Sequence, residues 1–172
     1  MLFLKLLQQI VRALNSDGTP GQVAAGLTLG AALGLTPLMT LHNLVIFAVV
    51  TLANVSFPGA MLGWALFAPV GFALDSLFDS IGRRLLLDLP GLAPVWTAVY
   101  NTPVLSLANL NNSIVLGSLL TWLVVALPLY FAARLAVARY REQVYQRLAR
   151  TKFFRAMTAS KLYNAYRWFQ PE

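Results

Sequence analysis

The residues of this chain that could do chemistry are few, and the most unusual of them lie in a long uncharged run. Residues 18–74 contain no Asp, Glu, Lys or Arg. A compact polar group inside this run consists of Thr36, Pro37, His42 and Asn43. Polar side chains in an apolar segment need hydrogen-bond partners, and an imidazole there can also relay a proton. The group is either a structural turn or a polar site of a transport path.

A nine-residue pattern around Pro37 occurs a second time. Residues 36–44 and 102–110 share the pattern T-P-x-x-[T/S]-L-x-N-L, which pairs Asn43 with Asn109. Paired, proline-interrupted segments in two halves of a membrane protein can mark a repeat with a site between them near the midplane. We therefore add Asn109 to a candidate midplane polar site; a chance match in so apolar a chain is the alternative.

Asp75, Asp79 and Arg83 form a charged cluster at i, i+4 and i+8 of an expected helix. This spacing places them on one helix face, and the acid-first order of Asp79 and Arg83 favours an ion pair. One interpretation is a helix that emerges among lipid headgroups with solvated charges. The other is an acidic pair at a cavity mouth, which would bind a cation or a basic segment of a partner.

The residue inventory argues against catalysis and metal binding. The chain has no Cys and one His, which excludes disulfides and thiol chemistry and argues against a multi-His metal site. The uncharged stretches offer neither an acid pair nor a Ser/His/Asp set. We therefore expect no enzyme activity, no cofactor and no metal.

Composition places the chain in a membrane. It is 58% hydrophobic and 11% charged, whereas soluble domains carry about 25% charged residues. The uncharged stretches 18–74 and 89–133 are each long enough to cross a bilayer, which takes about 20 helical residues. We predict an all-α, polytopic integral membrane protein with short helices interrupted by Gly and Pro. The predicted crossings are residues 21–36, 38–53, 58–81 and 113–134.

Two segments of this domain have patterns that a simple lipid-facing helix does not explain. Gly26, Gly30 and Gly34 recur every four residues, which places them on one helix face where a second backbone can approach closely. We interpret them as helix-packing residues, with a ligand role as the alternative. Segment 92–111 is rich in Pro and Asn, and broken backbone at membrane depth survives only inside protein or beside water. We predict that it is re-entrant or interfacial.

The two ends of the chain differ from the domain at residues 18–137. Residues 1–17 have the apolar periodicity of an amphipathic helix, which would lie in the headgroup region or pack on a partner. Residues 138–172 form a predicted helical tail, basic and rich in aromatics. Its cations suit anionic headgroups or a partner protein, and we expect no nucleic-acid partner because the tail follows a span directly. The candidate contacts are Arg139, Arg141, Arg147, Arg150, Lys152 and Arg155.

Charge asymmetry orients the chain. Residues 134–172 hold nine Lys or Arg and two Glu, a net charge of +7, which equals the net charge of the whole chain. The excess of Lys and Arg over this region predicts a cytoplasmic C-terminus. With four crossings, the N-terminus is cytoplasmic too.

A glycine-stepped apolar run, a proline, a polar residue in the next expected helix and an Asn before a second turn follow one another from Gly26 to Asn54. In this pattern the central segment resembles an uncharacterised bacterial membrane domain family, domain of unknown function 2062. The resemblance covers about residues 20–87 and weakens at residues 67–69, where the family usually has Asn-Pro. The stretch at residues 110–113 resembles a longer subgroup, whose members tend to be encoded beside large AsmA-like envelope proteins. The matching positions are Gly26, Gly30, Gly34, Pro37, His42 and Asn54. The resemblance implies a bacterial inner-membrane location and a partner of that type, and it supplies no activity.

Two functions follow as hypotheses. The first is a non-enzymatic inner-membrane subunit that anchors or assists a larger envelope complex, such as AsmA-like lipid transport. The second is a small stand-alone transporter or channel that uses the midplane polar site, in which case a homo-oligomer is possible.

Overall fold

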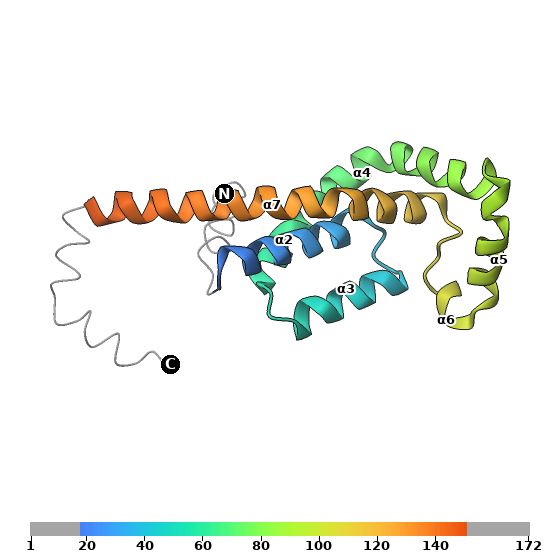
Figure 1. Cartoon of the computed structure of the whole chain (residues 1–172), viewed down its shortest axis with the longest axis horizontal. Helices are drawn as coiled ribbons and strands as arrows, with labels where there is room; N and C mark the ends of the chain where they lie inside the picture. The colour runs from blue at the N-terminus through green and yellow to red at the C-terminus, as the bar shows by residue number, and fades with distance from the viewer. Residues whose placement is uncertain (1–17, 151–172) are drawn as a thin grey trace. The chain divides into compact units, whose positions relative to one another are not determined.

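The computed structural model describes residues 18–150, with side chains through residue 143, and every element in this range is helical. The all-α prediction is therefore confirmed for these residues. The predicted helix within residues 1–17 and the tail beyond residue 150 lie outside the described range. The elements are α2 Pro20–Leu35, α3 Leu41–Leu52, α4 Phe57–Leu87, the 3₁₀ turn η1 Pro90–Leu92, α5 Ala93–Asn101, α6 Pro103–Ser106 and α7 Ser113–Arg150 (Figure 1).

By its internal contacts the chain divides after Val137. The first unit holds the helices from α2 to α6 and the part of α7 that ends at Val137. The second unit begins at Ala138, and its described part is the remainder of α7. The uncharged polar group and the glycine positions of the sequence therefore belong to the first unit.

Local sequence explains where α2 begins and ends. Pro20 is its first residue, where a missing N–H costs nothing. Thr19 and Gln22 form a capping box: the Gln22 N–H donates to Thr19 Oγ1 at 3.2 Å, and the Thr19 N–H donates to Gln22 Oε1 at 2.6 Å. The helix ends before Thr36, whose backbone is extended, because a residue that precedes proline is disfavoured in the α conformation.

The main helix contact of the first unit joins α2 to α4 backbone to backbone. A Cβ on Gly30 would overlap the carbonyl oxygen of Ala60, and a Cβ on Gly26 would overlap that of Ser56. A Cβ on Gly34 would lie 2.7 Å from the backbone nitrogen of Ala68. The three glycines of α2 therefore all lie against α4, where only the absence of a side chain permits this approach.

A second crossing of the same kind joins α4 to α7. A Cβ on Gly82 would overlap the carbonyl oxygen of Ser113, and a Cβ on Gly117 would overlap that of Phe78. Phe78 is fully buried beside this crossing. Glycine thus serves as the packing residue at both ends of α4, although the sequence pattern pointed only to α2.

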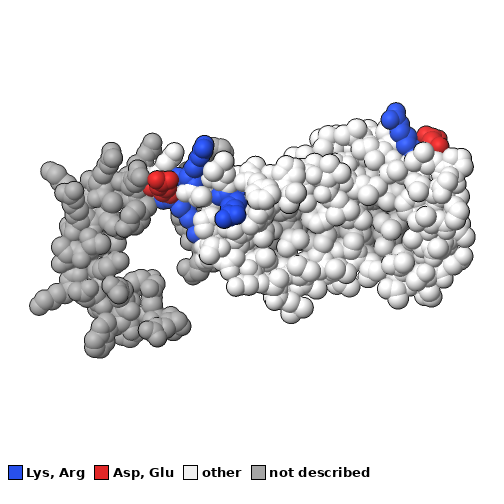
Figure 2. All heavy atoms as spheres, in the orientation of Figure 1, with Lys and Arg blue, Asp and Glu red and all other residues white. Residues whose placement is uncertain are grey.

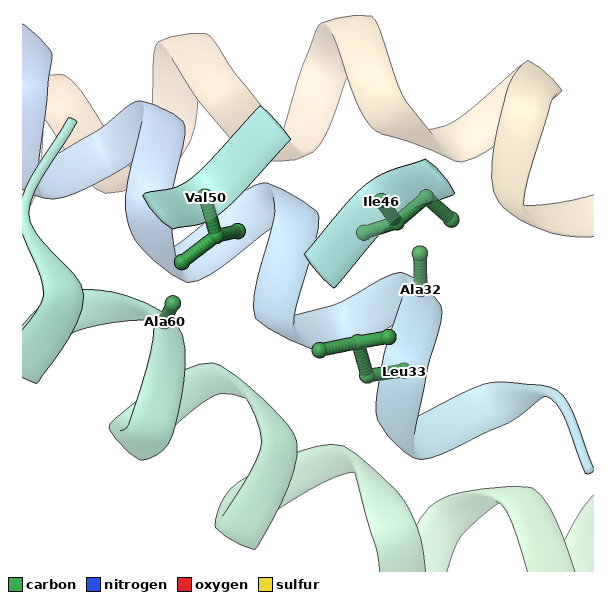
Figure 3. Packing of buried hydrophobic residues seen from close by; sticks show 5 residues of the cluster. All are labelled: Ala32, Leu33, Ile46, Val50 and Ala60. Atoms are coloured by element: carbon green, nitrogen blue, oxygen red, sulfur yellow. The ribbon is translucent and has the colours of Figure 1, made fainter. Parts of the chain in front are cut away.

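Helix α3 is attached to the rest through a small apolar core. Ala32 and Leu33 of α2, Ile46 and Val50 of α3, and Ala60 of α4 point toward one another (Figure 3). The opposite side of α3 is exposed, which leaves this helix with one packed face and one open face. The exposed large side chains of α3 are Leu44, Val45, Phe47, Val49 and Leu52.

Two of the described helices are long and apolar enough to cross a membrane. These are α4 and the Ser113–Gln143 part of α7, with mean hydropathies of 1.5 and 2.2, and only 28% and 22% of their most apolar windows are buried. A core helix of a soluble protein would be mostly buried. Helices α2 and α3 are apolar but shorter, about 24 and 18 Å at 1.5 Å per residue. The face drawn in Figure 2 is uncharged over most of the first unit.

We predict that Gly30→Ala destabilises the fold, because its Cβ would meet the Ala60 backbone rather than a flexible side chain. The expected net loss of unfolding free energy is about 1–3 kcal/mol, even after a gain of about 1 kcal/mol in helix propensity. The measurement is thermal unfolding of the detergent-solubilised full chain. Gly91→Ala is the control, since no described residue lies within 4 Å of a Cβ there. Equal midpoints for the two variants would contradict the backbone contact.

Candidate functional site

The polar residues between α2 and α3 form a local hydrogen-bond network. The Thr36 hydroxyl lies 2.8 Å from the Ala32 carbonyl oxygen and 2.7 Å from Asn43 Oδ1, and Asn43 Nδ2 donates to the Pro37 carbonyl oxygen at 2.7 Å. Thr36 and Asn43 are buried. The Ala32 carbonyl oxygen also accepts the Thr36 N–H, and the Pro37 carbonyl oxygen lies in the turn after α2, so Asn43 ties the start of α3 to the end of α2.

His42 lies at the edge of this network, and only one of its two ring nitrogens takes part in it. Its Nε2 lies 3.0 Å from the hydroxyl of Thr40, which itself lies 3.2 Å from the Pro37 carbonyl oxygen. The other ring nitrogen, Nδ1, is buried without a partner among the described residues. An unpaired buried polar atom costs about 1–3 kcal/mol. His42 is therefore the residue of this group that can still take a proton or a ligand.

The two Thr-Pro turns share local geometry. The Thr102 hydroxyl lies 2.9 Å from the Ala98 carbonyl oxygen, as the Thr36 hydroxyl lies 2.8 Å from that of Ala32. The Ser106 hydroxyl lies 2.7 Å from the Pro103 carbonyl oxygen, as the Thr40 hydroxyl lies 3.2 Å from that of Pro37. The turns also touch, because the Leu41 N–H donates to the Leu107 carbonyl oxygen at 3.3 Å. Leu41 and Leu107 occupy the same position of the repeated pattern.

The two copies diverge after this contact. Asn43 is buried inside α3, whereas Asn109 is exposed in the turn before α7 with a φ of 53°. Asn tolerates this left-handed conformation better than most residues. The structure thus brings Thr36, Pro37 and Asn43 together and connects His42 through Thr40. Asn109 lies in a separate turn, and its amide does not mirror that of Asn43.

The charged cluster on α4 contacts the first residue of α7. Arg83 Nε donates to Asp79 Oδ2 at 2.8 Å, and the Ser113 hydroxyl donates to the other carboxylate oxygen. The ion pair itself adds little, since the Arg83 side chain is 66% exposed. Its useful contact is with Ser113, the first residue of α7, next to the backbone contact with Gly82. Asp75 is partly exposed one turn earlier in α4.

The described residues contain no group of three or more His, Asp or Glu that could hold a metal ion. The predicted lipid contacts of the tail are only partly covered by the structure. Arg139 is exposed and Arg141 is half-buried. Of Arg147 and Arg150 only the helical backbone is described, while Lys152 and Arg155 lie outside the described residues.

An apolar groove between α3 and α4 is the feature that sequence reasoning missed. It has a volume of about 580 Å³ and is bounded by α2, α3, α4 and the turn after α6. Periodicity could have identified the second apolar face of α3, but nothing local predicts which side chains of α4 face it. The lining residues are Leu33, Leu38, Met39, Thr40, Leu41, Asn43, Leu44, Phe47, Met61, Trp64 and Leu107.

Comparison with known proteins identifies a family whose description names no activity. A family model described as "Uncharacterized protein conserved in bacteria (DUF2062)" matches residues 4–146. An uncharacterized protein of Treponema pallidum (strain Nichols) is 30% identical over 151 residues, which cover 88% of this chain and 93% of that protein. No solved structure matches the chain.

We predict that Asn43→Ala lowers the free energy of unfolding by about 1–3 kcal/mol, because it removes one of the two partners of the Thr36 hydroxyl and the nearer of the two donors to the Pro37 carbonyl oxygen. Thermal unfolding of the solubilised full chain measures this. Asn101→Ala is the matched control, since Asn101 is exposed near the end of α5 and should change stability by less than about 0.5 kcal/mol. An Asn43 variant as stable as the control would show that the network does not hold the turn.

Proposed function

Because this chain belongs to the bacterial family DUF2062, whose description names no activity, we propose a function from its surfaces: a non-enzymatic inner-membrane subunit that anchors or assists a larger envelope complex. One observation carries the proposal. The described helices expose large apolar side chains on α3, α4 and α7, while most polar groups of the candidate sites are already paired within the chain.

The proposed placement is multi-pass. Helix α4 and the apolar part of α7 have spanning length, and α2 with α3 form a short hairpin beside them. Whether the hairpin crosses twice or turns back inside the bilayer, it returns the chain to the side on which it began. The basic excess after residue 133 supports a cytoplasmic C-terminus, and this parity then makes the N-terminus cytoplasmic as well.

A scaffolding role suits the polar groups better than catalysis does. Thr36 and Asn43 hydrogen-bond within the α2–α3 turn, and the two carboxylate oxygens of Asp79 accept from Arg83 and Ser113. Groups already paired in this way are poor nucleophiles and bases without a further rearrangement. The open face of α3 and the basic tail are the surfaces left for a partner and for anionic headgroups.

The cargo of the proposed complex is lipid. The groove between α3 and α4 is apolar apart from Thr40 and Asn43, which suits an alkyl chain and not a hydrated solute. The partner would be a large envelope protein of the AsmA-like type, as the resemblance of the longer subgroup implies. In this arrangement the present chain anchors the complex at the inner membrane.

A stand-alone transporter or channel is the second candidate, and His42 favours it. Its Nδ1 is buried and has no partner within the part of the chain that the structure describes, and its Nε2 lies 3.0 Å from the hydroxyl of Thr40, which lines the groove. A proton or a polar substrate could use this nitrogen. The two candidates differ in what the protein does without a partner.

Gentle extraction of the tagged full chain from native membranes, with crosslinking and mass spectrometry, tests the subunit proposal. We expect a large envelope protein in stoichiometric amount, and we expect His42→Ala to retain it. Purification of the chain alone as a homo-oligomer, together with loss of transport in His42→Ala, would overturn the subunit proposal in favour of the transporter.

A cysteine-labelling experiment tests the topology, and the natural absence of Cys makes it direct. Arg84→Cys, near the end of α4, should react with a membrane-impermeant maleimide added to intact spheroplasts. Arg134→Cys, in α7, should react only after permeabilisation. Protection of residue 84 in intact spheroplasts would rule out the proposed parity.

A further inference from the structure

The groove exists because α3 packs on α2 and leaves a gap toward α4. Ile46 and Val50 attach α3 to the core (Figure 3). Leu44 and Phe47 of the same helix line the groove from one side, and Met61 and Trp64 of α4 line it from the other. Leu44 is 65% exposed and Phe47 is 46% exposed, so the groove is open to the surroundings of the helices.

The chemistry of the walls selects an uncharged, apolar occupant. Residues 18–74, which supply all of the lining except Leu107, carry no formal charge. Thr40 and Asn43 are the polar lining residues, and both lie at the end where α3 begins. Asn43 Nδ2 carries two hydrogens and donates one of them to Pro37, which leaves the second for an acceptor such as an ester carbonyl.

The size of the groove favours a thin ligand over a fully inserted protein helix. Its volume of about 580 Å³ lies within the range of about 300–1,000 Å³ for small-molecule sites. A helix about 10 Å across would fill this volume in roughly 7 Å of its length, less than two turns. The groove therefore has room for less than two turns of a fully inserted helix, whereas a thin alkyl chain can run along it.

The surroundings identify the source of such a chain. The groove lies against α4, a helix of membrane-spanning length, and its rim continues into the exposed apolar residues Leu38 and Met39. We propose that the groove binds one acyl chain of a membrane phospholipid, with the ester region near Thr40 and Asn43. This inference rests on the membrane placement in the proposed function and deepens it by naming the site that holds the lipid.

Native mass spectrometry of the full chain tests the proposal with two matched variants of α3. Leu44→Trp fills the groove, and Leu52→Trp places the same side chain at a position that is 87% exposed and outside the lining. In detergent that strips loosely bound lipid, we expect the wild type and Leu52→Trp to retain one phospholipid per chain. Leu44→Trp should retain about tenfold less, the factor for a loss of about 1.4 kcal/mol in binding.

A second measurement needs no variant. Phosphatidylglycerol with a diazirine in one acyl chain, reconstituted with the wild type and photolysed, should label the peptide that contains Met61 and Trp64 more than the exposed apolar part of α7. Even labelling of both regions would overturn the proposal, as would equal lipid retention by the two Trp variants. Crosslinks from Met61 to residues 1–17 or to a second copy would overturn it by revealing a protein occupant.

The two sets of experiments distinguish a failure of the lipid-site proposal from a failure of the proposed function. If Leu44→Trp loses the lipid but still co-purifies with the large envelope protein, both proposals stand and the lipid is not needed for assembly. If the wild type retains the lipid but brings no partner, the site stands and the subunit role falls. If the partner co-purifies and no lipid is retained by any form, the groove proposal falls alone.

Discussion

The backbone-to-backbone contact of α2 with α4 is the constraint on which the rest of the first unit depends. Gly26, Gly30 and Gly34 bring the two helices together with no side chain between them. In the bilayer placement that we propose, apolar side chains gain little by leaving lipid, so close packing of small residues would supply the attraction between helices. The contact between α2 and α4 is therefore close and narrow. Large apolar side chains point outward from it.

The α2–α4 junction also explains why only a small apolar core attaches α3 to the other helices. The core that attaches it contains two alanines among its five residues, because a larger side chain near the crossing would push the backbones apart. Helix α3 therefore rests on one face and leaves a gap toward α4. The groove and the open face of α3, and with them the proposed lipid and partner contacts, follow from the close approach of α2 and α4.

A few polar groups among the described residues connect segments that are separate in the sequence. The Thr36–Asn43 pair closes the turn at Pro37, and the Asp79–Ser113 contact fastens the start of α7 to α4. A further brace is the indole N–H of Trp122 in α7, which donates to the carbonyl oxygen of Thr28 in α2 at 2.9 Å. Buried polar atoms in an apolar environment are costly when unpaired, so each brace favours one arrangement of the helices. His42, one nitrogen of which has no partner within residues 18–143, departs from this pattern and is the residue that the transporter alternative depends on.

The sequence by itself determined what depends on neighbours along the chain. The helical class, the break before Pro37 and the Asp79–Arg83 ion pair follow from periodicity, from the conformation that proline imposes and from i, i+4 spacing. Only the tertiary structure decided that Gly82 and Gly117 meet α7 and α4 backbones, that Asn109 lies apart from Asn43, and that a groove opens between α3 and α4. Periodicity reports which residues share a helix face, but it does not report which other helix that face meets. That choice is made by contacts between residues far apart in sequence, such as Asp79 with Ser113.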